Sequence, residues 1–130
     1  MLPRVLDPRV TRLAEMLCSH STSLGPDDTV LIHAFDIPNE SVAEVVRAAQ
    51  ATGAQVVTRL ESSVVRRQML LGIEERNIET IAKCERFEME QMTAYIALRG
   101  GDNSMEMSDV PGQTLQSWQK LYGVPVVFEV

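Results

Sequence analysis

The most constraining feature of the sequence is a regular alternation of two hydrophobic patterns. Three short segments, residues 29–35, 54–60 and 94–99, are rich in apolar residues, as is typical of strands covered by helices. Residues 8–18, before the first strand, and the segments between strands carry apolar residues at helical spacing. Such alternation, with residues 125–129 as a further strand, predicts parallel strands joined by right-handed crossovers. We therefore predict a three-layer α/β fold, Rossmann-like or flavodoxin-like, with a mainly parallel sheet of about four strands and helices on both faces.

Capping residues and glycines predict where the first two helices begin and end. Pro8 is favoured in the first turn of a helix, and Gly53 is the residue type that commonly ends one. Ser41 and Glu44 have the spacing of a capping box, although Asn39 is an alternative cap. The predicted buried stripes are Val10, Leu13, Ala14, Leu17 and Cys18 on the first helix, and Val42, Val45, Val46 and Ala49 on the second.

The long segment between the second and third strands also has helical character. Ser62 is a predicted N-cap, and Gly72 is predicted to end the helix that it starts. Residues 74–92 predict further helix, either continuous or with one break. Three acidic residues in it, Glu85, Glu88 and Glu90, point in different directions on one helix. They therefore predict a solvent-exposed face in preference to a dinuclear metal site.

Composition narrows the classes of protein to which the chain can belong. The 130 residues predict one domain, and a net charge of −6 without a basic patch argues against nucleic-acid binding. No apolar segment approaches the roughly 20 residues that span a membrane, and residues 1–12 lack the core of a signal peptide. We expect a cytoplasmic protein whose two cysteines, Cys18 and Cys84, are reduced and buried.

The third predicted strand ends in a glycine-containing loop, which is the main candidate for a binding site. Ligands of open α/β folds bind at the carboxyl edge of the sheet. The candidate loop there consists of Arg99, Gly100, Gly101, Asp102 and Asn103. It predicts either an anion-binding nest or a plain strand-to-helix turn, in which the glycines need positive φ and Asn103 or Ser104 caps the helix.

No catalytic or metal-binding motif is present in the sequence. The chain has two histidines, and no zinc-protease, nucleophile-elbow, paired-cysteine or phosphate-loop pattern. His33 lies near the end of the first predicted strand, where it is either a ligand or, as the favoured interpretation, a hydrogen-bonded histidine of the core or edge. We predict no catalytic residue and no metal ligand in this chain.

Several segments, in order along nearly the whole chain, resemble one family of enzymes. The segments are residues 6–17, 25–32, 48–57 and 94–103, the last followed by 108–111. They are similar to the N-terminal domain of the M29 metallopeptidases, the aminopeptidase T-like thermophilic aminopeptidases. One departure is that Gly25 precedes Pro26, where the family usually has the reverse order before its first strand.

The resemblance implies a function for the parent enzyme and a limited role for this chain. M29 enzymes remove N-terminal residues from peptides with two divalent metal ions, zinc, cobalt or magnesium. Side chains of a later, C-terminal domain hold these ions, so no metal ligand carries over to this chain. We expect an inactive accessory domain, either a truncated or proteolysed form of the longer enzyme or a divergent stand-alone copy. Such a domain would contribute to the substrate cleft and to dimer contacts.

Two further expectations concern partners. A domain that normally contacts a catalytic domain should expose apolar surface and form a homo-oligomer. The candidate interface residues are Met105, Met107, Trp118, Tyr122 and Phe128. The alternative function is a stand-alone α/β module that binds a small anionic ligand at the carboxyl edge of the sheet, near residues 34–35 and 100–101.

Overall fold

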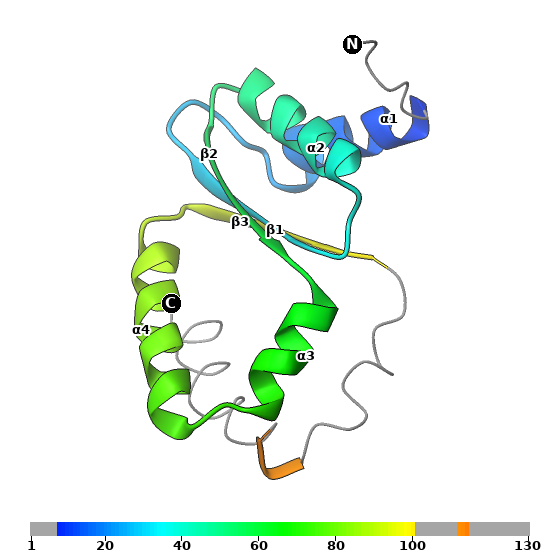
Figure 1. The fold of residues 1–130 in the computed structure, drawn as a ribbon. Helices are drawn as coiled ribbons and strands as arrows, with labels where there is room; N and C mark the ends of the chain where they lie inside the picture. Colours follow the sequence, from blue (N-terminus) through cyan, green and yellow to red (C-terminus); the bar gives the residue numbers. More distant parts are fainter. Residues whose placement is uncertain (1–7, 101–111, 115–130) are drawn as a thin grey trace, which may run out of the picture. The chain divides into compact units, whose positions relative to one another are not determined.

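A computed structural model describes residues 8–100 and 112–114 of the chain (Figure 1). The chain divides into two compact units. Residues 8–60 and 92–100 belong to the first unit, and residues 61–91 and 112–114 belong to the second. In the described ranges, no helix has the length and hydrophobicity needed to cross a membrane.

The first unit is built on a parallel sheet of three described strands, β1 (Thr29–Phe35), β2 (Gln55–Glu61) and β3 (Ala94–Arg99). Their order is β2-β1-β3, so β1 is central, and β3 pairs with it in parallel from Val30↔Ala94 to Phe35↔Arg99. The predicted α/β class is thereby confirmed, with strand bounds within one residue of those expected. The fourth predicted strand, residues 125–129, lies outside the described residues.

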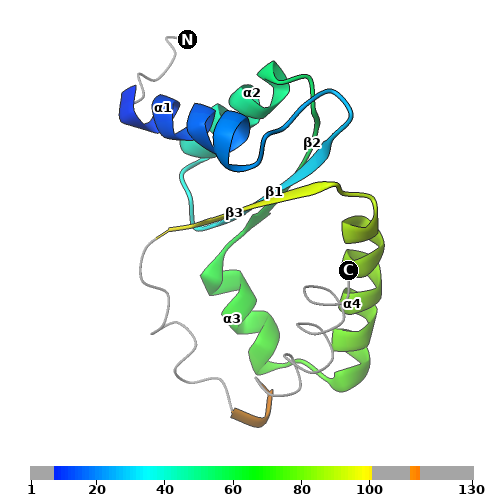
Figure 2. The same cartoon turned by 180° about the vertical axis from the view of Figure 1, so that it is seen from behind.

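Helices α1 (Pro8–Met16) and α2 (Asn39–Ala51) lie together on one side of this sheet (Figures 1 and 2). Side chains alternate between the two faces of a strand, so residues 30, 32 and 34 of β1 point to the same side. They form one hydrophobic core with the two helices and with β3. Its main members are Ala14, Cys18, Val30, Ile32, Ala34, Val42, Val45, Ala48, Ala49 and Ile96. Leu31, on the opposite face of β1, is 2% exposed, as expected for a central strand.

The first helix differs from the prediction in its buried face and in its length. Only Ala14 and Cys18 of the predicted stripe are buried, whereas Leu13 is 58% exposed. The predicted burial of Leu13 was wrong because the apolar stripe of the first helix is wider than the part of the molecule that packs against it. The chain also continues from α1 into a π-helix, η1 (Leu17–Ser21), which extends beyond the residues 8–18 predicted to be helical. The backbone N–H of Thr22 donates to the carbonyl of Leu17 at 3.1 Å and closes this segment.

The start of α2 differs from both predicted caps. Pro38 occupies the N-cap position, and no side chain caps the helix there. Ser41 lies inside the first turn, and its N–H donates to the carbonyl of Pro38 at 3.0 Å. The other end agrees with the sequence, since Gly53 follows the C-cap residue with φ of +90°. The capping-box spacing was misleading because the N-cap residue is Pro38, three positions before Ser41.

The second unit contains α3 (Ser63–Leu71) and α4 (Glu75–Glu90). The predicted cap of α3 is confirmed, because the hydroxyl of Ser62 accepts a hydrogen bond from the N–H of Val65 at 3.4 Å. The continuous alternative is confirmed for α4, whose buried residues include Ile78 and Ala82. Glu85 is 8% exposed, so its predicted solvent exposure was wrong. It lies seven positions after Ile78 and three after Ala82, which places it on the buried stripe of the helix.

Candidate binding site at the carboxyl edge of the sheet

The carboxyl ends of β1 and β3 lie side by side, and two of the predicted loop residues are found there. Phe35 and Arg99 are register partners, and the N–H of Gly100 donates to the carbonyl of Phe35 at 2.9 Å. The other predicted loop residues, Gly101, Asp102 and Asn103, lie outside the described residues. So do the predicted interface residues Met105, Met107, Trp118, Tyr122 and Phe128.

Gly100 is required by close packing of the backbone at this edge. A Cβ atom at this position would lie inside 3.0 Å of the carbonyl oxygen of Asp36, and 3.0 Å from Cδ1 of Ile37. Asp36 itself has φ of +54°, an uncommon value for a residue other than glycine, which shows how sharply the chain turns after β1. The φ of Gly100 is not in the positive range, and Gly101, the other glycine of the predicted turn, lies outside the described residues. The glycine is needed for space.

The side chains of Arg99, Phe35 and His33 lie in a row at this edge of the sheet. The guanidinium carbon of Arg99 lies 5.2 Å from the centroid of the Phe35 ring, a cation–π contact. The ring of His33 lies 4.9 Å from that of Phe35. Arg99 is exposed, and in the described part of the chain no carboxylate forms an ion pair with it. The row thus ends in a charged group that faces solvent.

His33 agrees with the favoured interpretation of the sequence. It is 8% exposed, and its Nδ1 shares a hydrogen bond with the Tyr95 hydroxyl at 2.8 Å. Residues 8–100 and 112–114 contain no group of three or more His, Cys, Asp or Glu side chains that could hold a metal ion. Sequence reasoning missed Tyr95 as the partner of His33. No local signal for this pair was present in the sequence, because it depends on the register in which Tyr95 pairs with Leu31, two residues before His33 on the same face of the sheet.

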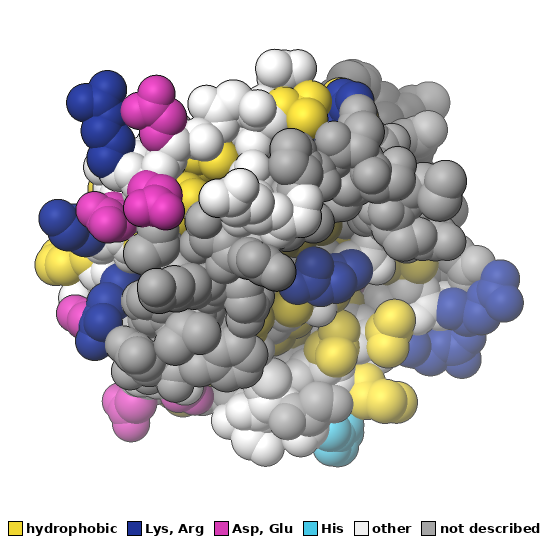
Figure 3. Space-filling view, turned by 90° about the horizontal axis from the view of Figure 1, so that it is seen from below, with side chains coloured by type: hydrophobic (Ala, Val, Ile, Leu, Met, Phe, Trp, Pro, Cys, Tyr) yellow, Lys and Arg dark blue, Asp and Glu magenta, His cyan; other side chains and the backbone are white. Residues whose placement is uncertain are grey.

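An apolar cavity of about 360 Å³ opens next to Arg99 in the first unit. Its walls are α1, the start of α2 and the carboxyl end of β3. The described lining residues are Val10, Leu13, Ala14, Leu17, Ile37, Pro38, Ser41, Val45, Ala97, Leu98 and Arg99. Leu13 is 58% exposed and belongs to this lining, so the exposed part of the α1 stripe is a wall of the cavity. Figure 3 views the molecule from below, where other hydrophobic side chains reach the surface.

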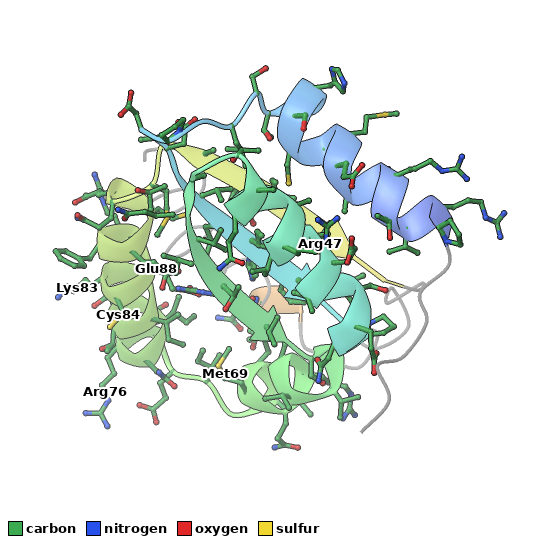
Figure 4. All side chains as sticks on the ribbon, turned by 90° about the horizontal axis from the view of Figure 1, so that it is seen from above. Arg47, Met69, Arg76, Lys83, Cys84 and Glu88 are labelled. Atoms are coloured by element: carbon green, nitrogen blue, oxygen red, sulfur yellow. The ribbon has the colours of Figure 1, made fainter. Side chains whose placement is uncertain are left out.

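An ion-pair network holds the two helical walls of the cavity together. Arg47 of α2 contacts Glu15 of α1 at 3.2 Å and Glu44 of its own helix at 2.6 Å (Figure 4). The hydrogen bond from Arg47 lowers the pKa of the Glu44 carboxyl, and the same bond raises the pKa of the Arg47 guanidinium. Both groups are in contact with water, so the network contributes orientation more than stability.

The two cysteines have different environments. Cys18 is buried against α2, and loss of hydration raises the pKa of its thiol. Cys84 projects from α4 beside Lys83 and is exposed, so its predicted burial was wrong (Figure 4). Both cysteines are free thiols.

Comparison with known proteins identifies the family. Residues 6–124 match the family described as thermophilic metalloprotease (M29). The chain belongs to this family. The resemblance of its segments to M29 enzymes is thereby confirmed across nearly the whole chain. No curated protein sequence matches the chain.

A solved structure has the same fold as this chain. Wild-type AmpT from Thermus thermophilus superposes with a TM-score of 0.71 at 15% sequence identity. The match covers 92% of this chain and 31% of the AmpT chain. At this identity the likeness concerns the fold alone, and this chain spans about a third of the length of AmpT.

Proposed function

We propose that this chain is the N-terminal accessory domain of a metal-dependent aminopeptidase. In this role it contributes to the substrate cleft and to dimer contacts, and the hydrolytic reaction takes place elsewhere in the parent enzyme. The observation that carries the proposal is the M29 match over residues 6–124, in a chain that spans 31% of AmpT. The predicted loop residues Gly101, Asp102 and Asn103 extend the cleft wall in this proposal. The interface residues predicted from the sequence form the dimer contacts.

The described residues do not fit a dinuclear metal site. Such a site needs several carboxylates and imidazoles that converge on two ions roughly 3.5–4 Å apart. The described ranges contain no cluster of three such side chains, and His33 is engaged by Tyr95. The proposal therefore assigns the two divalent ions to the remainder of the parent enzyme, and no step of hydrolysis to residues of this chain.

Activity measurements on three forms of the protein test the proposal. They are the 130-residue chain, the product of any longer reading frame that includes it, and that product without residues 1–130. Each is assayed for release of a chromogenic amine from an aminoacyl amide with zinc, cobalt or magnesium. We expect activity from the complete longer product alone. Release by the 130-residue chain that a chelator abolishes would refute the proposal.

A stand-alone module that binds a small anion is the second candidate function. The observation that favours it is the exposed Arg99 at the carboxyl edge of the sheet, with which no carboxylate of the described residues forms an ion pair. A guanidinium is a suitable partner for a small anion. A reading frame that stops after Val130, together with saturable binding of inorganic phosphate, would favour this function over the first.

A further inference from the structure

Strand β3 lies at one edge of the sheet, and within residues 8–100 and 112–114 it pairs with β1 alone. We propose that the outer edge of β3 is an interaction surface for a second copy of the chain. The two β3 strands pair antiparallel about a two-fold axis at Ala97, so that the two sheets become one. This surface differs from the interface residues predicted from the sequence, and it goes beyond the proposed function because it does not depend on peptidase activity.

The two edge strands of the described sheet differ in the features that prevent pairing with another chain. An edge strand presents a row of unpaired N–H and C=O groups, and charged residues commonly keep other strands away from it. Strand β2 has polar residues at Gln55 and Thr58 and charged residues at Arg59 and Glu61. Strand β3 has the sequence Ala-Tyr-Ile-Ala-Leu-Arg, whose one charged residue, Arg99, comes last. Of these two edges, that of β3 is therefore the one suited to a partner strand.

The side chains of β3 complement a second copy of the same strand. Tyr95, Ala97 and Arg99 share one face of β3, and all three are exposed, Tyr95 by 42%. Antiparallel pairing centred on Ala97 places Tyr95 of each copy opposite Arg99 of the other, where a cation and an aromatic ring attract each other. On the other face, Ile96 and Leu98 become apolar cross-strand neighbours. Each of these contacts occurs twice, which favours a second copy over an unrelated strand.

Helix α1 supplies further apolar surface beside the same strand. Leu13 and Met16 of α1 are 58% and 55% exposed. Leu13 also lines the apolar cavity between α1, the start of α2 and Leu98 of β3. Because the two-fold axis is perpendicular to the paired sheets, α1 of both copies lies on the same side of the continuous sheet. The exposed α1 stripes therefore add apolar contact area to a strand edge that is short by itself.

Cross-linking of the 130-residue chain tests both the contact and its register. In a background with Cys84→Ser, which removes the exposed native thiol, Ala97→Cys places one thiol of each copy at the axis. Directly opposed residues of antiparallel strands have Cα atoms roughly 4.5–5.5 Å apart, within the roughly 4.4–6.8 Å that a disulfide spans. We expect this variant to form a covalent dimer under mild oxidation. Thr58→Cys, at an exposed position of the other edge strand, is the matched control and should form little covalent dimer.

Sedimentation equilibrium over a range of concentrations measures the non-covalent dimer. Ala97→Lys should weaken dimerisation by about tenfold or more, because it places two like charges opposite each other at the axis. Leu13→Asp should weaken it as well, through the loss of apolar contact. Thr58→Lys is the control and should dimerise like the parent chain. All three positions are exposed, so the variants should keep the fold, which circular dichroism checks.

Several results would overturn the inference. They are a monomer at every concentration, a dimer that Ala97→Lys leaves unchanged, and equal cross-linking of Ala97→Cys and Thr58→Cys. Slow hydrogen exchange at every amide of β3 in a monomer would assign the edge to another segment of the same chain. Because none of these readouts is hydrolysis, the surface can fail while the aminopeptidase proposal stands, and the reverse.

Discussion

Replacement of Gly100 by alanine should destabilise the first unit through a single steric conflict. The new Cβ would lie 3.2 Å from the carbonyl carbon of Asp36 and closer still to its oxygen. Neither backbone segment can move easily, because Gly100 is hydrogen-bonded to Phe35 at 2.9 Å and Asp36 already has positive φ. Overpacking of this kind costs about 1–3 kcal/mol, and the lower entropy of the unfolded chain offsets about 0.4–1 kcal/mol. We expect a net loss of about 1–2 kcal/mol in the free energy of unfolding.

The matched control is Gly25→Ala in the same unit. No atom lies within 4 Å of a Cβ placed at Gly25, and its φ is not positive. This variant should be neutral or more stable by up to about 1 kcal/mol, through the unfolded chain alone. Urea unfolding followed by circular dichroism gives both values, provided that the slope against urea concentration is unchanged. If Gly100→Ala were as stable as Gly25→Ala, the argument that the two strand ends are closely packed would be wrong.

Two further predictions follow from the titratable side chains. A disulfide-exchanging thiol reagent should modify Cys84 rapidly in the folded protein and Cys18 only after denaturation. The reason is that Cys18 is buried and burial raises the pKa of its thiol, so little reactive thiolate forms. Equal rates of modification for the two cysteines would contradict this prediction. Because the pKa of Glu44 is lowered from its ordinary value of 4.5 by folding, its stabilising effect is present above that value and is lost as the pH falls through the lowered pKa. Unfolding at a series of pH values should therefore show a smaller loss of stability in acid for Glu44→Gln than for the parent chain, and identical profiles would contradict it.

The strands of the first unit could be predicted from the sequence because burial fixes their pattern. β1 is buried at every position from Val30 to Ala34, so nearly every position is apolar and its limits are sharp. The third strand was equally clear, since Gly100 follows it at once. The residue type at position 100 indicated a special backbone environment, but the sequence could not show that the cause is the carbonyl of Asp36, which comes from a turn 64 positions earlier.

The candidate site could be predicted only in part, because its components come from elements that are far apart in the sequence. Arg99 and Gly100 were placed at the carboxyl edge correctly. The pairing of His33 with Tyr95 and the contact of Arg99 with Phe35 depend on the register of β1 against β3, which no local pattern specifies. Cap predictions failed at α2 for a related reason, since the route of the chain after β1 decides where that helix begins.

The partly open stripe of α1 shows what helical periodicity leaves undetermined. Helical periodicity identifies which residues share a face, but the width of that face is set by what packs on it. Ala14 of α1 and Cys18 of η1 are almost completely buried, while Leu13 on the same apolar stripe stays open. A helix that served only to cover the sheet would need no apolar residue at position 13. The additional hydrophobic surface forms one wall of the cavity between α1, the start of α2 and the end of β3.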